Sequence, residues 1–423
     1  MLTVIAGINW GDEGKGRMVD LLSEGQDVVV RYQGGNNAGH TVVNDKGRFV
    51  LNLLPSGILR EDKVNVMGCG MVVDAEHLSK EVGRLRAAGV KISPDNLKIS
   101  DRAVICFPYN VMQDCLEEDR LGDKKFGSTR RGIAPIYADK YMKKAVRMGD
   151  LLHPSYLAER LAVILEWKNM GLSAYKGARK YSVGEMTDWL AEYAEEFKPY
   201  ICDTGEYLTR AAAEGKNIMF EAQLGALRDI DFGIYPYTSS SSTIAAYAPV
   251  GAGVPNLKTD KTIGIMKAYS TCVGEGPFTA EMFGEEAERL REAGGEYGAA
   301  TGRPRRVGGF DVVASRYGCR VQGADELALT KLDILDGMDS IPVVDAYETS
   351  DGLTAEFPFG EKLASAKPHI VRFEGWKTST SGCRRFGDLP DAAKKYVDYI
   401  ERAVERPVKY VSVGAEREQI IIR

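Results

Sequence analysis

The segment that decides the fold reads LTVIAGI at residues 2–8, WGDEGKGR at residues 10–17 and MVDLL at residues 18–22. The first run is apolar throughout and has the length of a buried strand, and the last has helical spacing. A glycine-rich loop between a strand and a helix directs backbone N–H groups and a helix N-terminus at phosphate. This order of elements therefore predicts an α/β protein that binds phosphate.

The loop also carries side chains that can do chemistry. Lys15 can meet phosphate oxygens, and the nearby Asp12 can hold Mg²⁺ or accept a proton. The loop departs from the usual phosphate-loop pattern, because Asn9 stands at the leading glycine and Gly16 at the magnesium-binding Ser or Thr. A turn that binds no ligand would explain the glycines, but it would not explain why Asp12, Glu13 and Lys15 crowd into it.

A second glycine-rich turn, GGNNAGHT, follows at residues 34–41. It contains His40, one of only 4 histidines in the chain. Asn37 and Thr41 add hydrogen-bonding groups, and Gly39 leaves a carbonyl open to a metal ion. A histidine is often structural, but these neighbours favour a functional role for His40.

Short apolar runs recur along the chain and alternate with helical patterns. We expect strands near residues 27–32, 64–67, 103–107, 217–220, 262–266, 326–329, 341–344 and 409–413, and helices near residues 75–88, 155–167, 183–197 and 283–293. Continuous apolar strands separated by amphipathic helices predict a large, mostly parallel sheet with helices on both faces. Residues 251–256 and 294–306 are expected to be long loops. Since no linker-like stretch divides the chain, we expect residues 1–423 to form a single domain.

Composition narrows the class of protein further. The formal net charge of -5 gives no electrostatic footprint for nucleic acid, and no stretch is long and apolar enough to cross a membrane. The 7 cysteines are odd in number and scattered, which is not typical of a disulfide framework or zinc cluster. The N-terminal residues lack the basic start of a signal peptide. We therefore expect a reduced, cytoplasmic protein that interacts with neither nucleic acid nor membrane.

Four other segments are candidates for nucleotide or carboxylate binding. Lys331 and Asp333 in TKLD follow a predicted strand, where an Asp can accept both N–H groups on the Watson–Crick edge of guanine. The loop GAATGRPRR at residues 298–306 holds arginines suited to carboxylate or phosphate, although a solvated basic turn would have the same composition. The hydroxyl-rich segments at residues 128–132 and 238–243 are either polar turns or phosphate cradles.

Together these segments resemble the adenylosuccinate synthetase family, which joins IMP and aspartate with GTP. The resemblance runs from Ile5 to about Arg417. Its ordered markers are WGDEGKG at 10–16, NAGHT at 37–41, PSGILR at 55–60, DIDFG at 229–233, KAYST at 267–271, TGRPRR at 301–306 and TKLD at 330–333. The resemblance implies a large, mostly parallel sheet flanked by helices, phosphate-loop-like with inserted loops and helices, and a homodimer.

The resemblance also implies a role for each matching residue. Asp12 and His40 are the implied catalytic pair, with Asp12 as base at N1 of IMP and His40 as general acid. Mg²⁺ is implied as cofactor, with Asp12 and the Gly39 carbonyl as ligands. The implied GTP residues are Gly11, Asp12, Glu13, Gly14, Lys15, Gly16, Arg17, Gly39, His40, Thr41, Arg305, Lys331, Leu332, Asp333, Ser412, Val413 and Gly414. The implied IMP residues are Asp12, Glu13, Gly14, Lys15, Asn37, Ala38, Gly39, His40, Thr129, Lys143, Gln223, Thr238, Ser239 and Arg303. The implied L-aspartate residues are Ala299, Ala300, Thr301, Gly302, Arg303, Pro304 and Arg305.

Four positions depart from the family pattern, all on the substrate side. Lys143 matches an Arg that reaches the IMP phosphate of the neighbouring subunit, and Lys keeps the charge but loses the fork. The expected Gln or Asn of the IMP site falls on Leu224, with Gln223 one position earlier. A family Thr becomes Ser239, beside Thr238, and Ala300 replaces a Thr of the aspartate loop.

Two alternatives stay open at this point. A related branch uses the 2-aminopurine nucleotide dGMP in place of IMP, and its members tend to lose the acid that matches Asp12. Retention of Asp12 favours IMP. A guanine-nucleotide switch without ligase activity is the other alternative, but such a protein would need neither His40 beside an acid nor an arginine loop.

Overall fold

The computed structural model describes residues 1–44, 47–298, 302 and 304–423, apart from the side chain of residue 44, and is built around a 10-stranded sheet. The strand order is β20-β19-β15-β11-β1-β10-β2-β5-β7-β9, and every neighbouring pair is parallel except β19 and β20. The strands are β1 (Leu2–Gly7), β2 (Val28–Arg31), β5 (Val64–Met67), β7 (Leu97–Ser100), β9 (Ile201–Cys202), β10 (Ile218–Gly225), β11 (Lys261–Lys267), β15 (Glu326–Thr330), β19 (Val408–Ser412) and β20 (Ile420–Ile422). The predicted large, mostly parallel sheet is confirmed.

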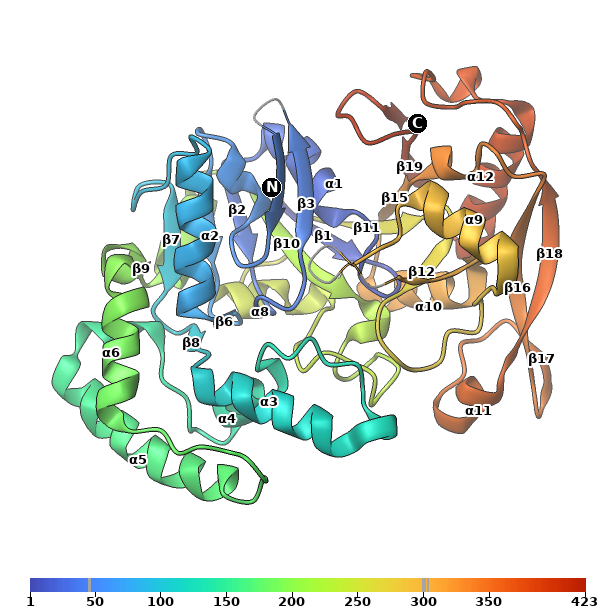
Figure 1. Ribbon diagram of the computed structural model, residues 1–423. Helices are drawn as coiled ribbons and strands as arrows, with labels where there is room; N and C mark the ends of the chain where they lie inside the picture. The colour runs from blue at the N-terminus through green and yellow to red at the C-terminus, as the bar shows by residue number, and fades with distance from the viewer. Residues whose placement is uncertain (45–46, 299–301, 303) are drawn as a thin grey trace.

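Both faces of the sheet are buried, and β1 shows why. Its side chains alternate between two hydrophobic clusters, since Val4 packs with α7 and α8 on one face while Ile5 packs with α1 on the other. A strand buried on both sides needs apolar residues at successive positions, which explains the continuous run in the sequence. Figure 1 shows this layering, with β7 and β9 at the left of the sheet and β15 and β19 at the right. The helices are α1 (Lys15–Leu22), α2 (Ala75–Ala87), α3 (Pro108–Leu121), α4 (Ile133–Tyr141), α5 (Pro154–Leu172), α6 (Val183–Tyr193), α7 (Thr204–Ala213), α8 (Ala248–Ala252), α9 (Gly284–Gly294), α10 (Val312–Gln322), α11 (Gly360–Ser365) and α12 (Asp391–Val404).

Smaller sheets surround the central one. A hairpin of β3 (His40–Asn44) and β4 (Gly47–Leu51) packs against α1. A mixed sheet with β16 at its centre stands at the right of Figure 1, beside α11 and α12. The remaining strands are β6 (Val72–Val73), β8 (Val104–Ile105), β12 (Ser270–Cys272), β13 (Arg306–Gly308), β14 (Phe310–Asp311), β16 (Ser340–Thr349), β17 (Gly352–Thr354) and β18 (Lys367–Glu374).

The structure corrects the expected position of several elements. The run at 103–107 gives the short β8, which pairs with β6 outside the central sheet, and the run at 341–344 lies in β16 of the mixed sheet. An apolar run predicts a strand but does not say which strand it pairs with. The helix expected at 183–197 ends at Tyr193 and gives way to a 3₁₀ turn that contains Pro199. The loop expected at 251–256 begins inside α8.

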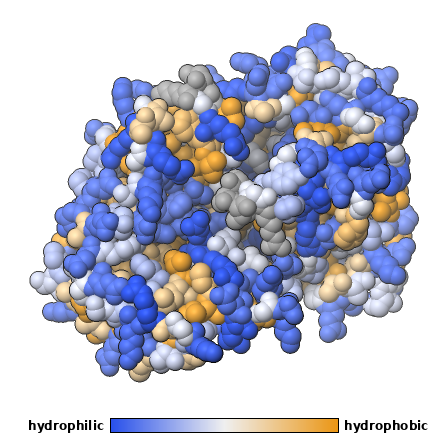
Figure 2. Space-filling model, viewed as in Figure 1, coloured by the Kyte–Doolittle hydropathy of each residue, from blue (hydrophilic) through white to orange (hydrophobic). Residues whose placement is uncertain are grey.

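Within the described part of the chain, none of the helices combines the length and apolarity needed to cross a membrane. Hydrophilic residues cover much of the face seen in Figure 2, with hydrophobic residues scattered between them. This distribution is ordinary for the outside of a folded protein.

Candidate functional site

The motifs meet because their strands are neighbours in the central sheet. The first glycine-rich loop follows β1, Lys267 ends β11, TKLD begins at Thr330, the last residue of β15, and Ser412 ends β19. On the other side of β1, Glu221 lies on β10 and the turn at residues 34–39 follows β2. Parallel strands present their carboxyl ends at one edge of a sheet, and open α/β proteins bind ligands there. The expected functional segments therefore line one edge of the sheet.

The first glycine-rich loop is held in shape from inside by Glu13. Its Oε1 atom accepts hydrogen bonds from the backbone N–H groups of Asn9 (3.0 Å) and Gly11 (2.8 Å), and its Oε2 atom pairs with Lys15 Nζ (2.7 Å). Glu13 and Lys15 are both almost fully buried. Gly11 has a φ of 109°, a conformation that favours glycine. The Glu13 carboxylate thus stabilises the loop, and its ion pair with Lys15 keeps the lysine amine buried against the loop.

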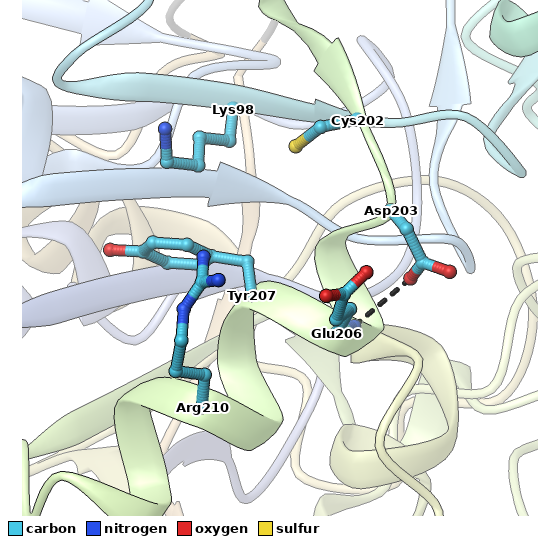
Figure 3. Close-up of a pocket in the computed structure, with 6 residues that line it drawn as sticks. All are labelled: Lys98, Cys202, Asp203, Glu206, Tyr207 and Arg210. Atoms are coloured by element: carbon cyan, nitrogen blue, oxygen red, sulfur yellow. Dashed lines mark hydrogen bonds between the residues drawn. The ribbon is translucent and has the colours of Figure 1, made fainter.

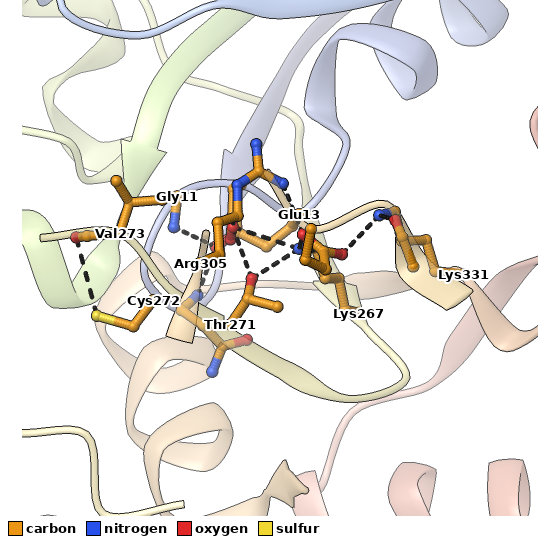
Figure 4. A network of polar contacts seen from close by, with 12 residues as sticks. Gly11, Glu13, Lys267, Thr271, Cys272, Val273, Arg305 and Lys331 are labelled. Carbon is orange, nitrogen blue, oxygen red and sulfur yellow. Dashed lines mark hydrogen bonds and ion pairs between the residues drawn. The ribbon is translucent and has the colours of Figure 1, made fainter. Parts of the chain in front are cut away.

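Asp12 faces a cluster of two cations, Lys267 and Arg305. Figure 4 shows these two side chains in the same polar network as Thr271. The Asp12 Oδ2 atom accepts a hydrogen bond from Thr271 Oγ1 (2.6 Å) and lies 3.3 Å from Lys267 Nζ and 3.4 Å from Arg305 Nε. Burial alone would raise the pKa of this carboxyl, but Lys267 and Arg305 outweigh it and lower the pKa below its usual value. Asp12 is therefore ionised at neutral pH, as a base must be.

A second carboxylate, Glu296, completes the cluster. It is fully buried and accepts hydrogen bonds from Lys267 Nζ (3.0 Å), Lys331 Nζ (2.6 Å), Arg305 Nη1 (2.6 Å) and the hydroxyl of Tyr269. Burial opposes ionisation of Glu296, but the three cations prevail and hold its pKa well below the usual range. The cluster joins segments after β11, α9 and β15 that are far apart in the sequence.

His40 lies at the start of the β3–β4 hairpin and is paired with a buried acid. Its Nδ1 atom shares a short hydrogen bond with Glu221 Oε1, and Glu221 also accepts from the backbone N–H (2.7 Å) and hydroxyl (2.6 Å) of Ser56. Burial lowers the pKa of His40, although Glu221 opposes the shift. The His40 Nε2 atom is buried and has no hydrogen-bond partner among the described residues. This nitrogen is available to a ligand, while Glu221 fixes the ring.

Close backbone packing brings the hairpin to the first loop. A Cβ atom on Gly16 would lie 2.7 Å from the Cβ atom of His40, so only glycine permits this approach. The turn at residues 34–38 is supported from β10, where the fully buried Gln223 amide donates to the carbonyl of Gly35 (2.8 Å) and accepts from its N–H (3.1 Å). The Gln223 side chain is thus bonded to the turn itself, and its expected contact with IMP stays a prediction.

The expected guanine-reading segments are also brought together. Arg17 donates to Ser412 Oγ and to the Glu416 carbonyl (2.6 Å), and Thr330 Oγ1 donates to the Glu13 carbonyl (2.7 Å). Burial lowers the pKa of Arg17, and the nearby Asp333 carboxylate opposes that shift. The first loop, TKLD and the turn after β19 therefore border one another.

The other expected ligand residues are more exposed or lie outside the described chain. Thr129 and Lys143 are exposed, Thr238 and Ser239 are half-buried, and Ser239 Oγ lies 3.2 Å from Ser241 Oγ. In the arginine loop, Gly302 and Pro304 are exposed. The expected ligand residues Ala299, Ala300, Thr301 and Arg303 lie outside the described residues.

A hollow of about 200 Å³ lies elsewhere, between β7 and α7 (Figure 3). It is lined by Lys98, Cys202, Asp203, Glu206, Tyr207 and Arg210. Lys98 Nζ stands 5.0 Å from the centre of the Tyr207 ring, and Asp203 caps α7 by accepting from the Glu206 N–H (3.0 Å). None of these residues comes from the glycine-rich or TKLD motifs, so the hollow is separate from the candidate site.

Sequence reasoning missed Glu221, Lys267 and Glu296 as site residues. Lys267 lies in the KAYST motif, and the motif by itself assigns this lysine no role in the site. Glu221 directly follows the apolar run Ile218–Phe220 of β10, and a charged residue at such a position is rarely buried unless it is paired. The charge of Glu221 next to an apolar run therefore indicates a buried, paired carboxylate. Nothing comparable marks Glu296, because its partners come from distant segments.

A mostly parallel sheet with a glycine-rich loop, buried carboxylates and clustered cations defines an α/β enzyme that handles phosphorylated ligands. The family model described as adenylosuccinate synthetase matches residues 4–421. The chain belongs to the adenylosuccinate synthetase family, whose members ligate IMP and aspartate in purine biosynthesis. It is accordingly an enzyme, a ligase of that family.

Individual relatives agree over nearly the whole length. The chain is 46% identical to adenylosuccinate synthetase 2 of Pseudoalteromonas translucida (99% of each chain) and 46% identical to the synthetase of Caldanaerobacter subterraneus subsp. tengcongensis (100% and 99%). The structure of a fully ligated adenylosuccinate synthetase from Plasmodium falciparum matches with a TM-score of 0.92 at 31% identity, covering 100% of this chain and 99% of that one. The cyanophage S-2L succinoaminodeoxyadenylate synthetase, at 18% identity and a TM-score of 0.60, shares the fold, covering 100% of this chain and 95% of that one.

Proposed function

We propose that this protein ligates L-aspartate to IMP with GTP as the energy donor, giving adenylosuccinate, GDP and phosphate through a 6-phosphoryl-IMP intermediate. The observation that carries the proposal is the match to named adenylosuccinate synthetases at 46% identity over the full length. The chemistry explains the intermediate, since O6 of IMP is a lactam oxygen and cannot leave as oxide or hydroxide. Phosphorylation of O6 makes it a leaving group that the aspartate amine can displace.

Asp12 is proposed as the base that takes the proton from N1 of IMP. Its lowered pKa keeps the carboxylate ionised, and the adjacent Lys267 and Arg305 compensate its burial. Removal of the N1 proton moves negative charge onto O6, which then attacks the γ-phosphoryl group of GTP. Lys15, held 2.7 Å from Glu13, is proposed to meet the phosphate oxygens.

His40 is proposed to stabilise the transferring phosphoryl group and to act as general acid. In a neutral ring whose Nδ1–H donates to Glu221, Nε2 has no proton to give. A phosphoryl oxygen placed beside Nε2 would favour the doubly protonated ring, which could donate a hydrogen bond to it. The Glu221 carboxylate would balance the positive charge of that ring. The pair thus supports a histidine that gains its proton when an anionic ligand arrives.

GTP is proposed to lie between the first loop and TKLD, in contact with the GTP residues named from the sequence. The hydrogen bond from Arg17 to Ser412 and that from Thr330 to Glu13 support this position. IMP and aspartate are proposed to meet the remaining expected residues, with the arginine loop at residues 303–306 around the two carboxylates of aspartate.

A divalent ion is expected for the family, and we propose Mg²⁺. The described residues contain no cluster of three or more His, Cys, Asp or Glu side chains able to hold a metal. Asp12 and the carbonyl of the exposed Gly39 fit a magnesium ion that takes its other ligands from substrate phosphates and water. Such an ion would neutralise phosphate charge during transfer.

A homodimer is also proposed, with Lys143 reaching the IMP site of the partner subunit. Tyr141 and Met142, just before Lys143, are 76% and 54% exposed. Next to them, Lys140 donates to the Cys69 carbonyl (3.3 Å) and the Cys69 thiol donates to the carbonyl of Val250, itself 47% exposed. Exposed apolar residues gathered in this way favour a protein interface.

A cytoplasmic location is proposed as well. All 7 cysteines are free thiols, which supports it, because disulfides are rare in a reducing compartment.

Phosphate release tests the proposed reaction. The protein is mixed with Mg²⁺ and GTP, and then with IMP, aspartate or both. The ligase requires phosphate release only when both substrates are present, with adenylosuccinate as product. Release with neither substrate would instead indicate a guanine-nucleotide switch. Replacement of IMP by dGMP tests the 2-aminopurine alternative, and faster turnover with dGMP would overturn the choice of IMP.

A further inference from the structure

The Glu296 carboxylate connects three parts of the candidate site. Lys331 belongs to the expected guanine-reading segment, Arg305 to the arginine loop, and Lys267 touches both Glu296 and Asp12. Figure 4 shows Lys331, Lys267 and Arg305 converging from separate segments of the ribbon. Glu296 is fully buried, so a lost partner could not simply be replaced by bulk water.

Each partner is held in a way that fixes its orientation. The Lys331 amine donates to Glu296 (2.6 Å) and to the Gly294 carbonyl (2.8 Å), which anchors its methylene stem as stacking on a planar base requires. Arg305 donates to Glu296 from Nη1 (2.6 Å), and its backbone N–H donates to the Glu296 carbonyl (2.9 Å). Glu296 therefore holds Arg305 by both main chain and side chain.

We propose that Glu296 is a positioning residue that orients Lys331, Arg305 and Lys267 together. The inference rests on the proposed ligase function. It assigns to one buried carboxylate joint control of GTP binding and aspartate binding.

The charge balance gives this role a distinct signature. Glu296 and Asp12 carry two negative charges opposite Lys267, Lys331 and Arg305, so one positive charge is left facing the site. Removal of the Glu296 charge would take away the acceptor that the three cations share. Lys331 and Arg305 would then lose the contact that orients them, and their like charges would be left unbalanced in a buried cluster.

The test compares Glu296→Gln with Glu296→Asp in the full-length protein. Glu286→Gln serves as the matched control, because Glu286 lies on α9 but pairs with the surface residue Arg372 (3.1 Å). Steady-state kinetics give KM for GTP, aspartate and IMP. Binding of a non-hydrolysable GTP analogue is measured separately, and circular dichroism with Tm reports folding.

Glu296→Gln should raise KM for both GTP and aspartate about tenfold or more, as expected when a charge-assisted hydrogen bond is lost. It should leave KM for IMP within a few-fold of the wild type, a split among the substrates that a merely structural role would not produce. Glu296→Asp keeps the charge but has a shorter reach, so KM for GTP and for aspartate should rise less than in Glu296→Gln. The Glu286 control should match the wild type.

Three outcomes distinguish a failure of the positioning role from a failure of the proposed ligase function. If the wild type ligates but Glu296→Gln behaves like the Glu286 control, the positioning role is wrong. If Glu296→Gln does not fold, Glu296→Asp decides, and unchanged KM values for GTP and aspartate overturn the role. If the wild type forms no adenylosuccinate, the ligase function fails. In that case, equal GTP-analogue binding by the wild type and Glu296→Gln would also overturn the link to Lys331.

Discussion

Asp12 and His40 each lie near a buried acid that opposes the net lowering of their pKa, but the two acids act differently. Glu221 bonds directly to His40 and favours its charged form against burial. Glu296 does not touch Asp12, and it acts through Lys267, which lies between the two carboxylates. Because both acids are fully buried, their charges are weakly screened. The charge near the proposed catalytic pair thus includes two buried acids, Glu221 and Glu296, that the motifs do not contain.

Asp12→Asn tests the role of the base. The amide keeps the size of the side chain but cannot accept the N1 proton, so turnover should fall about 10²- to 10⁴-fold. Binding of a GTP analogue should change little, because the loop is shaped by Glu13 rather than Asp12. Phosphate release and equilibrium binding measure the two effects. Turnover within a few-fold of the wild type would remove Asp12 from proton transfer.

Asp333→Asn tests the reading of guanine. A carboxylate accepts both N–H groups on the guanine edge, whereas an amide presents one oxygen and one NH₂ group that opposes a donor. The preference for GTP over ATP should drop about 10- to 100-fold, as expected for two charge-assisted hydrogen bonds. Competition of GTP against ATP in the phosphate-release assay measures it. Asp339→Asn, which changes an 83% exposed carboxylate beside Lys377, is the control and should keep the preference.

At the scale of elements, α1 and the β3–β4 hairpin form the contact that carries His40 to the first loop. The contact depends on Gly16, in the first turn of α1, where a Cβ atom would meet the backbone and Cβ atom of His40. Glu221 holds the ring of His40 from β10. The position of His40 is therefore set jointly by a helix, a hairpin and a central strand.

Gly16→Ala should displace the hairpin without unfolding the sheet. The added methyl group would lie 2.7 Å from His40 Cβ, so the hairpin has to move. Since a shift of about 1 Å in a catalytic group can cost 10²-fold in rate, kcat should fall by roughly that factor. Gly25→Ala is the control, because a Cβ atom there meets nothing within 4 Å. A Gly16→Ala variant with normal kcat would show that the hairpin tolerates the shift.

Elements with their own sequence pattern could be predicted, and those that depend on partners could not. The unit from β1 to α1 follows from a two-sided apolar strand and a glycine-rich loop, and the structure confirms it. The hairpin was missed because its strands pair mainly with each other and partly face solvent, so they lack a continuous apolar run. Of the mixed sheet, the run at 341–344 in β16 was predicted, but β18 was missed because exposed and covered residues alternate in it.

For the whole molecule, strand order decides what the site contains. β19, β15, β11, β1, β10 and β2 lie side by side, so their carboxyl ends collect residues from Asp12 to Ser412. The sequence predicts the strands but not this order, because order is fixed by tertiary packing. That is why the motifs proposed to read guanine and to catalyse the reaction could be found separately, while the link through Glu296 could not. That the whole chain, 1–423, forms one domain stays a prediction, supported by the position of β1 and β20 in one sheet.

The proposed dimer gives the last prediction, at the scale of the assembly. Lys143 is exposed beyond the end of α4, beside the exposed Tyr141, so its amine has room to enter a partner's site. Lys143→Ala should raise KM for IMP about tenfold, the cost of one lost phosphate contact, with little effect on GTP. Mixing it with the inactive Asp12→Asn variant tests the crossing, because a mixed dimer holds one site with the intact Asp12 and the partner's intact Lys143. Low KM for IMP should return on mixing, measured beside sedimentation of each variant. A monomeric wild type, or no recovery from a mixed dimer, would contradict the crossing.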